Sequence, residues 1–159
     1  MNMDDPTRLE HFKVHLAAAG PDPEHPDRFV ESQPPYRFID RILVRDDNEI
    51  RVLKNITRNE WCMVYSEQEG YRLPWSILLE CMAQTAGSYD EYLQKRVPPL
   101  RVLLTRIKHV ELKRSPEPGD QLLIIGRQLK ALSNNAMYEI EARIGEDVAA
   151  RCVIFFARV

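Results

Sequence analysis

The stretch LPWSILLECMAQTAGSYDEYLQKR, from Leu73 to Arg96, decides how the chain folds, because it is the only long segment patterned as a largely buried helix. Pro74 suits the first helical position, and Pro98 and Pro99 prevent the helix from continuing. Apolar residues spread almost all round the first half, whereas charged residues such as Asp90 make the second half more polar. The stretch therefore predicts a long central helix whose first half is enclosed by other structure.

A carboxylate, Glu80, lies within the apolar half of this predicted helix. Gln84 follows four residues later and Ser76 precedes by four, so the three polar side chains share one helix face. Glu80 is either the carboxylate of a functional site or a structural acid bonded to the backbone or to Gln84. The spacing alone leaves both interpretations open.

The composition is that of one soluble globular domain. The 159 residues, 44% hydrophobic and 29% charged, are enough for one core but not for two domains. A formal charge of −2 gives no electrostatic reason to expect a nucleic-acid partner. The chain has no apolar run of membrane-spanning length, and its acidic N-terminus differs from a signal peptide. Three cysteines without metal-ligand spacing (Cys62, Cys81 and Cys152) favour reduced thiols, no metal site and a cytoplasmic location.

The first 35 residues are expected to form an N-terminal helix and a proline-rich connector, separate from a main domain over residues 36–159. Asp5 can cap the helix, which Gly20 would end. His11 and His15 lie four residues apart on it, but without a third ligand they are interpreted as a solvated pair.

Strand-like segments flank the central helix. The expected strands cover Tyr36–Arg45, Glu49–Thr57, Val102–Arg114 with a bulge between Ile107 and Val110, Gln121–Leu132, Met137–Ile144 and Val148–Val159, and residues 59–73 are expected to be an ordered loop. Short turns between successive strands favour antiparallel pairing. The prediction is an α+β fold, a curled antiparallel sheet around one central helix, with a second copy of the chain covering an exposed edge strand.

Four segments give the chain a resemblance to a known family. They are PYRFIDRIL (Pro35–Leu43), KNITRNE (Lys54–Glu60), LPWSILLECMAQ (Leu73–Gln84) and ELKRSPEPGDQLLI (Glu111–Ile124). In this order they resemble the β-hydroxyacyl-acyl carrier protein dehydratases of fatty acid synthesis. The resemblance implies a hot-dog fold, a dimer and chemistry on acyl thioesters that requires no cofactor.

The resemblance also assigns roles to individual residues. In that family the helix carboxylate acts with a histidine fourteen residues earlier, which comes from the other subunit and removes the α-proton. Glu80 matches the carboxylate, whereas Ser66 stands at the position of the histidine and Trp75 replaces a glycine at the helix start. The implied catalytic residues are Glu80 and, in place of the histidine, Ser66. The implied substrate-binding residues are Tyr65, Trp75, Ser76 and Gln84.

The sequence is compatible with three functions. The first is a dehydratase-like protein that binds acyl chains on acyl carrier protein or coenzyme A, with weakened or rebuilt dehydration. The second is a thioesterase that uses Glu80 as base, and the third is a non-catalytic subunit of a dimer. Basic residues around the third strand are either a solvated face or a docking surface for an acidic carrier: Arg106, Lys108, Lys113 and Arg114. His109 lies on the same strand and is expected to be structural or solvent-facing.

Overall fold

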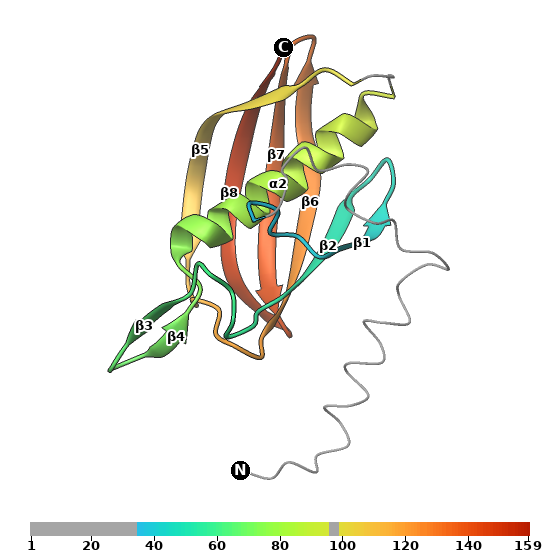
Figure 1. The fold of residues 1–159 in the computed structure, drawn as a ribbon. Coiled ribbons are helices and arrows are strands. Elements are labelled where there is room, and N and C mark those ends of the chain that lie inside the picture. The colour runs from blue at the N-terminus through green and yellow to red at the C-terminus, as the bar shows by residue number, and fades with distance from the viewer. Residues whose placement is uncertain (1–34, 96–98) are drawn as a thin grey trace.

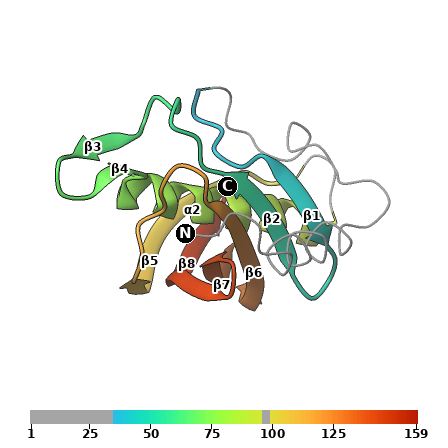
Figure 2. The same ribbon diagram turned by 90° about the horizontal axis from the view of Figure 1, so that it is seen from below.

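The structure, a computed structural model, describes residues 35–95 and 99–159 (Figure 1). In these residues the elements follow in the order β1 (Arg41–Arg45), β2 (Ile50–Asn55), β3 (Val64–Ser66), β4 (Gly70–Arg72), α2 (Trp75–Leu93), β5 (Val102–Leu112), β6 (Gln121–Leu132), β7 (Asn135–Ile144) and β8 (Asp147–Arg158). One six-stranded sheet has the order β1-β2-β6-β7-β8-β5, and β3 and β4 form a separate hairpin. Figure 2 shows α2 on the concave side of the sheet, which is the expected α+β hot-dog arrangement.

The strand pairings follow the hydrophobic pattern of the sequence. All the pairings in the large sheet are antiparallel. In β7 the side chains of Tyr138, Ile140 and Ala142 are fully buried toward α2, while the alternate residues are only half-buried. Gly126 of β6 lies under the helix, where an added Cβ would come within 2.9 Å of the Ile140 side chain. The glycine therefore leaves room for the side chains of Ile140 and Ile50, which come from the two neighbouring strands.

The connection between β5 and β6 differs from the sequence prediction. Short turns between successive strands predict that β5 and β6, joined by residues 113–120, pair with each other, but β5 pairs with β8 and forms an edge of the sheet. The segment instead crosses below the helix start, where the Leu73 N–H donates to the Pro116 carbonyl (2.8 Å). The expected bulge in β5 is confirmed, because its register shifts between Lys108 and Glu111.

The central helix begins one residue later than predicted. Pro74 has a non-helical backbone (φ −57°, ψ 144°) and is the N-cap, so Trp75 is the first helical residue. The Pro74 carbonyl already accepts hydrogen bonds from the N–H groups of Ile77 and Leu78, each at 3.0 Å. Leu78 and Met82 face the sheet and are fully buried, as the apolar pattern predicts.

The second half of α2 is not the polar half that the sequence suggested. Asp90 is fully buried, and it accepts hydrogen bonds from the Tyr138 hydroxyl (2.5 Å) and from Arg158 Nη2 (2.6 Å). Gln94 Nε2 donates to the same carboxylate at 2.9 Å. Partners from β7 and β8 thus allow a charged residue to be buried where its helix position alone would place it in water.

Three further expectations concern the loop over residues 59–73, the N-terminal residues and membrane-spanning segments. The loop over residues 59–73 contains the β3–β4 hairpin, which its pattern did not predict and which projects beyond the start of α2 (Figure 1). The N-terminal helix, His11 and His15 lie outside the described residues. Among the helices of the described ranges, none combines the length and apolar character needed to cross a membrane.

Candidate functional site

The middle of α2 presents Glu80 beside Gln84 on the helix face that points away from the sheet. Glu80 is half-buried, whereas Gln84 is only 8% exposed. The Gln84 Nε2 atom donates a hydrogen bond to Glu80 Oε1 at 2.9 Å. No hydrogen bond to Glu80 Oε2 is formed by the residues that the structure describes. One carboxylate oxygen is therefore fixed and the other is free.

The chain segment that leads into β1 crosses the helix beside this pair. Gln84 Nε2 donates to the Tyr36 carbonyl at 2.7 Å, and its Oε1 accepts from the Phe38 N–H at 3.0 Å. The Trp61 indole N–H donates to the Pro35 carbonyl at 3.2 Å and so holds the beginning of the same segment. Residues 35–38, called the cover segment below, are thus fixed to α2 and to the following loop.

Ser66 and Tyr65 lie on the projecting hairpin. Ser66 Oγ accepts a hydrogen bond from the Glu69 N–H (3.1 Å), which stabilises the β3–β4 turn. The Tyr65 side chain is 64% exposed, and its ring centroid lies 5.0 Å from that of Tyr71 on β4. In the described part of the chain no hydrogen bond joins Ser66 to Glu80. The two residues at the family's catalytic positions are therefore not assembled within one copy.

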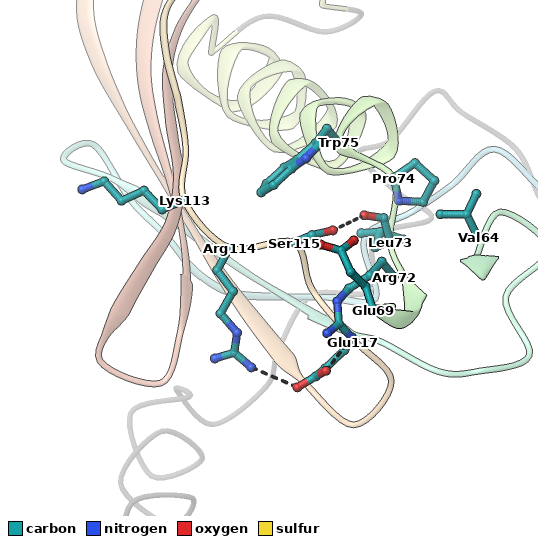
Figure 3. Close-up of a pocket in the computed structure, with 10 residues that line it drawn as sticks. All are labelled: Val64, Glu69, Arg72, Leu73, Pro74, Trp75, Lys113, Arg114, Ser115 and Glu117. Atoms are coloured by element: carbon teal, nitrogen blue, oxygen red, sulfur yellow. Dashed lines mark hydrogen bonds and ion pairs between the residues drawn. The ribbon is translucent and has the colours of Figure 1, made fainter. Parts of the chain in front are cut away.

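A cavity of about 370 Å³ lies at the start of α2 and brings together residues from distant segments (Figure 3). Its lining includes Trp75 together with Lys113 and Arg114, which follow β5. Ser76 is exposed next to it on the first turn. The structure thus places a predicted substrate-binding residue next to two predicted docking residues, although Glu80 is not among the lining residues.

Most of the charge around this cavity is already paired. Arg72 Nη1 lies 2.5 Å from Glu117 Oε2, and Arg114 Nη2 lies 2.9 Å from Asp120 Oδ1. Lys113 points away from the other lining residues in Figure 3 and lies 3.7 Å from Glu111. The cavity is consequently a mixed polar and aromatic site rather than a purely cationic one. Arg72 and Glu117 were not predicted, since their pairing depends on how the 115–120 segment crosses the helix start.

The other two predicted docking residues lie on an exposed edge. Arg106 and Lys108 belong to β5, which is an edge strand of the sheet and is exposed along most of its length. Lys108 lies over the ring of Phe155 on β8, 5.9 Å from its centroid. His109 is also exposed there and has a positive φ of 50°, which explains the bulge. This part of the basic cluster is therefore separate from the cavity.

A second cavity, of about 410 Å³, is lined by residues of the cover segment and of the segment 54–61. Trp61 and Phe38 contribute aromatic surface, and Lys54 and Glu60 form a shielded ion pair with 2.9 Å between Nζ and Oε2. The Glu60 Oε1 atom also accepts from the Thr57 N–H at 3.0 Å. The polar groups at the floor of this cavity are thus satisfied by protein partners.

Metal and thiol chemistry find no support among the described residues. No group of three His, Cys, Asp or Glu side chains there could hold a metal ion. Cys81, which follows Glu80, is fully buried toward the sheet, and burial raises the pKa of its thiol. Burial likewise raises the pKa of Cys62 and, to about 12, that of Cys152. The thiols are therefore protonated near neutral pH and poorly nucleophilic.

Comparison with known proteins identifies the family of this chain. No family model matches it. However, it is 31% identical over 123 residues to the 3-hydroxyacyl-(acyl-carrier-protein) dehydratase FabZ of Streptococcus equi subsp. zooepidemicus (strain MGCS10565), covering 77% of this chain and 87% of that protein. The chain belongs to the FabZ dehydratase family. The resemblance based on four motifs is confirmed.

Solved structures with similar folds include other members of the hot-dog class. The dehydratase heterocomplex ApeI:P from Xenorhabdus doucetiae gives a TM-score of 0.73 at 16% identity, over 86% of this chain and 91% of that one. A hypothetical thioesterase with coenzyme A from Streptococcus pneumoniae TIGR4 gives 0.59 at 11% identity, over 74% of this chain and 86% of that one. At these identities the two structures support the fold and not an activity.

Proposed function

We propose that this FabZ-family chain acts on 3-hydroxyacyl thioesters, with Glu80 as the acid that assists departure of the hydroxyl group. The observation that carries the proposal is the state of the Glu80 carboxylate. It is half-buried, one oxygen accepts a hydrogen bond from Gln84, and the other is free to face a substrate. A carboxyl group that is oriented but not neutralised by a cation suits proton transfer.

The dehydration proceeds by loss of one molecule of water from the substrate. A base takes the proton from the carbon next to the thioester carbonyl, and that electron pair forms the carbon–carbon double bond. The bond between the neighbouring carbon and its hydroxyl breaks, and the Glu80 carboxyl proton converts the leaving hydroxide into water. The products are an enoyl thioester, water and a Glu80 carboxylate. Transfer of the proton from the base to this carboxylate then regenerates the carboxyl group and the free base.

The base has to come from outside the cover segment and the helix. Ser66 stands at the position of the family histidine, but its hydroxyl is a poor base near neutral pH and caps a turn of the hairpin. We therefore propose that the catalytic pair is completed across a dimer. The long exposed edge strand β5, with Leu104, Val110 and Leu112 partly uncovered, supports such an assembly.

A different partner chain is the second candidate for that assembly. The structural neighbour ApeI:P is a heterocomplex of dehydratase subunits, which is the arrangement that would let another chain bring an imidazole to Glu80. In this version the present chain supplies Glu80 and the cavity, and it dehydrates substrate only when mixed with its partner. A homodimer in which Ser66 or Tyr65 replaces the histidine weakly is the other version.

The substrate is proposed to arrive on acyl carrier protein or on coenzyme A. The cavity at the start of α2 combines Trp75 with Lys113 and Arg114, so it could accept the polar arm that links the acyl group to its carrier. Arg106 and Lys108 extend the positive charge along β5. A cytoplasmic location agrees with three free cysteines, Cys62, Cys81 and Cys152, and residues 36–159 are proposed as the catalytic domain.

Thioester hydrolysis is the alternative reaction of the same site. The observation that supports it is that Glu80 alone, with one oxygen unbonded, could activate a water molecule. The same fold also occurs in the hypothetical thioesterase with coenzyme A. The first two N–H groups of α2, at Trp75 and Ser76, would then face the thioester carbonyl.

One set of assays separates these possibilities. Purified protein is incubated with 3-hydroxyacyl thioesters of several chain lengths on carrier protein and on coenzyme A, and the enoyl product and the free thiol are measured. Enoyl product that disappears in Glu80→Gln supports dehydration, whereas thiol release that disappears supports hydrolysis. The same assay with an added histidine-bearing family member tests the heteromeric version. If Glu80→Gln changes none of these readouts, the proposed site is wrong.

A further inference from the structure

The outer face of the large sheet carries an ordered arrangement of apolar and basic side chains. Figure 2 shows α2 on the concave side, so the outer face is the convex one. Along β7 and β8 the buried residues alternate with residues that face outward, such as Met137 and Phe155, which are half-buried. The strand register then shows which outward side chains lie beside one another on neighbouring strands.

The register places these side chains in three rows across the sheet, counted from the end that holds the β6–β7 turn. Each row runs through β6, β7, β8 and β5 in that order. The rows are Leu132, Asn135, Ala157 and Leu103; then Lys130, Met137, Phe155 and Arg106; then Arg127, Glu139, Val153 and Lys108. The first row has a leucine on each side, whereas the second and third rows have a cation on each side.

The leucines and the cations are both accessible. Leu132 is 57% exposed and Leu103 is 54% exposed. Lys130 and Arg106 are exposed, and neither lies within ion-pair distance of a carboxylate in the described part of the chain. Uncompensated positive charge therefore lies directly behind exposed leucines. The first two rows are called the end patch below.

The outer face beyond the third row is different, because its charges are balanced. Glu141 of β7 forms ion pairs with Arg143, at 2.6 Å, and with Arg151 of β8. These cations lower the pKa of Glu141, so the carboxylate remains charged and neutralises them. The contrast shows that the positive character of the end patch is local and is not a property of the whole sheet.

We propose that the end patch docks the protein on an anionic lipid surface. The leucines of the first row would enter the boundary between head groups and acyl chains, and Lys130 and Arg106 would meet the lipid phosphates. Successive outward residues of a strand are about 7 Å apart, which agrees with the depth of about 5–10 Å to which peripheral proteins bury their apolar side chains.

The shape of the patch favours a lipid surface over a partner protein. An acidic helix would need a groove to bury its apolar side, whereas the end patch lies on a convex face. Vesicle surfaces are broad and deformable and can meet such a face. The contact requires no membrane-spanning helix. It goes beyond the proposed reaction and does not depend on Glu80.

The proposed dimer would leave the end patch uncovered. A second copy that pairs with the edge of β5 uses the backbone N–H and C=O groups of this strand. The side chains of Leu103 and Arg106 project from the outer face instead. Lipid binding and dimer formation can therefore occur together.

Sedimentation with lipid vesicles tests the role of the cations. The full chain is expected to bind vesicles of phosphatidylcholine and phosphatidylglycerol in about equal amounts, less tightly as salt is added, and to bind phosphatidylcholine alone only weakly. Arg106→Ala combined with Lys130→Ala should weaken binding by about twenty-fivefold, because each cation near an anionic surface contributes about fivefold. Arg41→Ala is the matched control, since Arg41 is an exposed cation on β1 at the opposite edge, and it should change binding by less than about twofold.

A second pair of variants tests the leucines. Leu103→Ser combined with Leu132→Ser should weaken binding to the anionic vesicles by about tenfold or more, since less apolar surface is then removed from water. Val64→Ser is the control, because Val64 is 52% exposed but lies on the β3–β4 hairpin. All these side chains are exposed, so the unfolding curves of the variants should match that of the wild type.

One measurement needs no variant. In ¹⁵N spectra of the wild type, the signals of Leu103, Arg106, Lys130 and Leu132 are expected to broaden first when the anionic vesicles are added. The proposal is wrong if the chain does not bind these vesicles, if the leucine variant binds as tightly as the wild type, or if Val64→Ser causes the larger loss. It is also wrong if these four signals respond to purified acyl carrier protein and not to vesicles, because the end patch would then dock a protein.

Discussion

Two carboxylates on the same helix, Glu80 and Asp90, lie in contrasting surroundings. Asp90 is fully buried, and its oxygens bond to the Arg158 guanidinium, the Tyr138 hydroxyl and Gln94. Glu80 is half-buried and has a single neutral donor, Gln84. The Asp90 carboxylate has a cation and several donors, whereas Glu80 keeps one oxygen free.

The contrast indicates how the chain separates stability from chemistry. A buried carboxylate that is neutralised and fully bonded ties α2 to β7 and β8, but it has no oxygen left for a substrate. A half-buried carboxylate with one unbonded oxygen keeps an atom that can contact a substrate and transfer a proton. Asp90 therefore has the contacts of a structural carboxylate, whereas Glu80 is the carboxylate for which we propose the chemical role.

The largest effect on stability is expected at Asp90. Asp90→Ala leaves the mostly buried Arg158 guanidinium without its counter-charge, so the free energy of unfolding should fall by about 3–5 kcal/mol. A guanidinium stays protonated even without its partner, so Arg158 remains charged in the variant. Denaturant unfolding measures the change. A loss as small as that of an exposed ion pair would break the comparison.

A smaller effect is expected from the hydroxyl group that faces Asp90. Tyr138→Phe removes the donor to Asp90 and the acceptor for Gln128 Nε2, and should cost about 1–3 kcal/mol. Burial and the bond to Asp90 raise the pKa of Tyr138, so it is a neutral donor at all ordinary pH values.

The matched control is Tyr89 on α2, whose ring centroid lies 5.9 Å from that of Tyr138. It is also fully buried, but its hydroxyl has no hydrogen-bond partner within residues 35–95 and 99–159. Tyr89→Phe is expected to leave the unfolding free energy unchanged or slightly higher. Equal losses in the two variants would show that the carboxylate contact is not what makes Tyr138 important.

The sequence was sufficient to locate the six strands of the large sheet and the helix, because their apolar periods are strong, although it did not predict that β5 pairs with β8. It was not sufficient for Asp90, since the partners that allow its burial come from β7 and β8, about fifty residues or more away in the chain. Nor could it predict the β3–β4 hairpin, whose six strand residues have no clear alternation. Tertiary contacts decide both cases.

The same limit applies to the candidate site. Spacing predicted that Glu80 and Gln84 share a helix face, and their hydrogen bond confirms this. The contacts of Gln84 with Tyr36 and Phe38 were beyond sequence reasoning, since nothing local connects residues more than forty positions apart.

The reactivity of the cysteines tests whether α2 is packed tightly against the sheet. Cys81 faces the sheet beside Glu80, and burial raises its pKa; burial also raises that of Cys152 to about 12. Native protein is expected to react with a thiol reagent at neither residue within minutes, and unfolded protein at all three thiols. Rapid native reaction at Cys81 would mean that the helix is not sealed against the sheet.

The smallest expected effect concerns Asp46 in the β1–β2 turn. Hydrogen bonds from the N–H groups of Asn48 and Glu49 (2.8 and 3.0 Å) lower the pKa of Asp46 below its usual 3.8. The stabilisation is therefore present above the usual value of 3.8 and is lost as the pH falls through the lower, folded-state pKa. Asp46→Asn should lower the Tm slightly at pH 7. The difference should shrink at pH 3 and below, and a constant difference would contradict this origin.

The central claim, that Glu80 does chemistry while Asp90 holds the fold, is tested most directly by measuring unfolding and thioester turnover in Glu80→Gln and Asp90→Asn side by side. The account predicts that Glu80→Gln keeps the wild-type unfolding curve and loses on the order of a hundredfold or more in kcat. Asp90→Asn should unfold at a clearly lower denaturant concentration, while the molecules that remain folded turn over substrate at nearly the wild-type rate. Wild-type turnover in Glu80→Gln, under conditions where the native chain is active, would contradict the account.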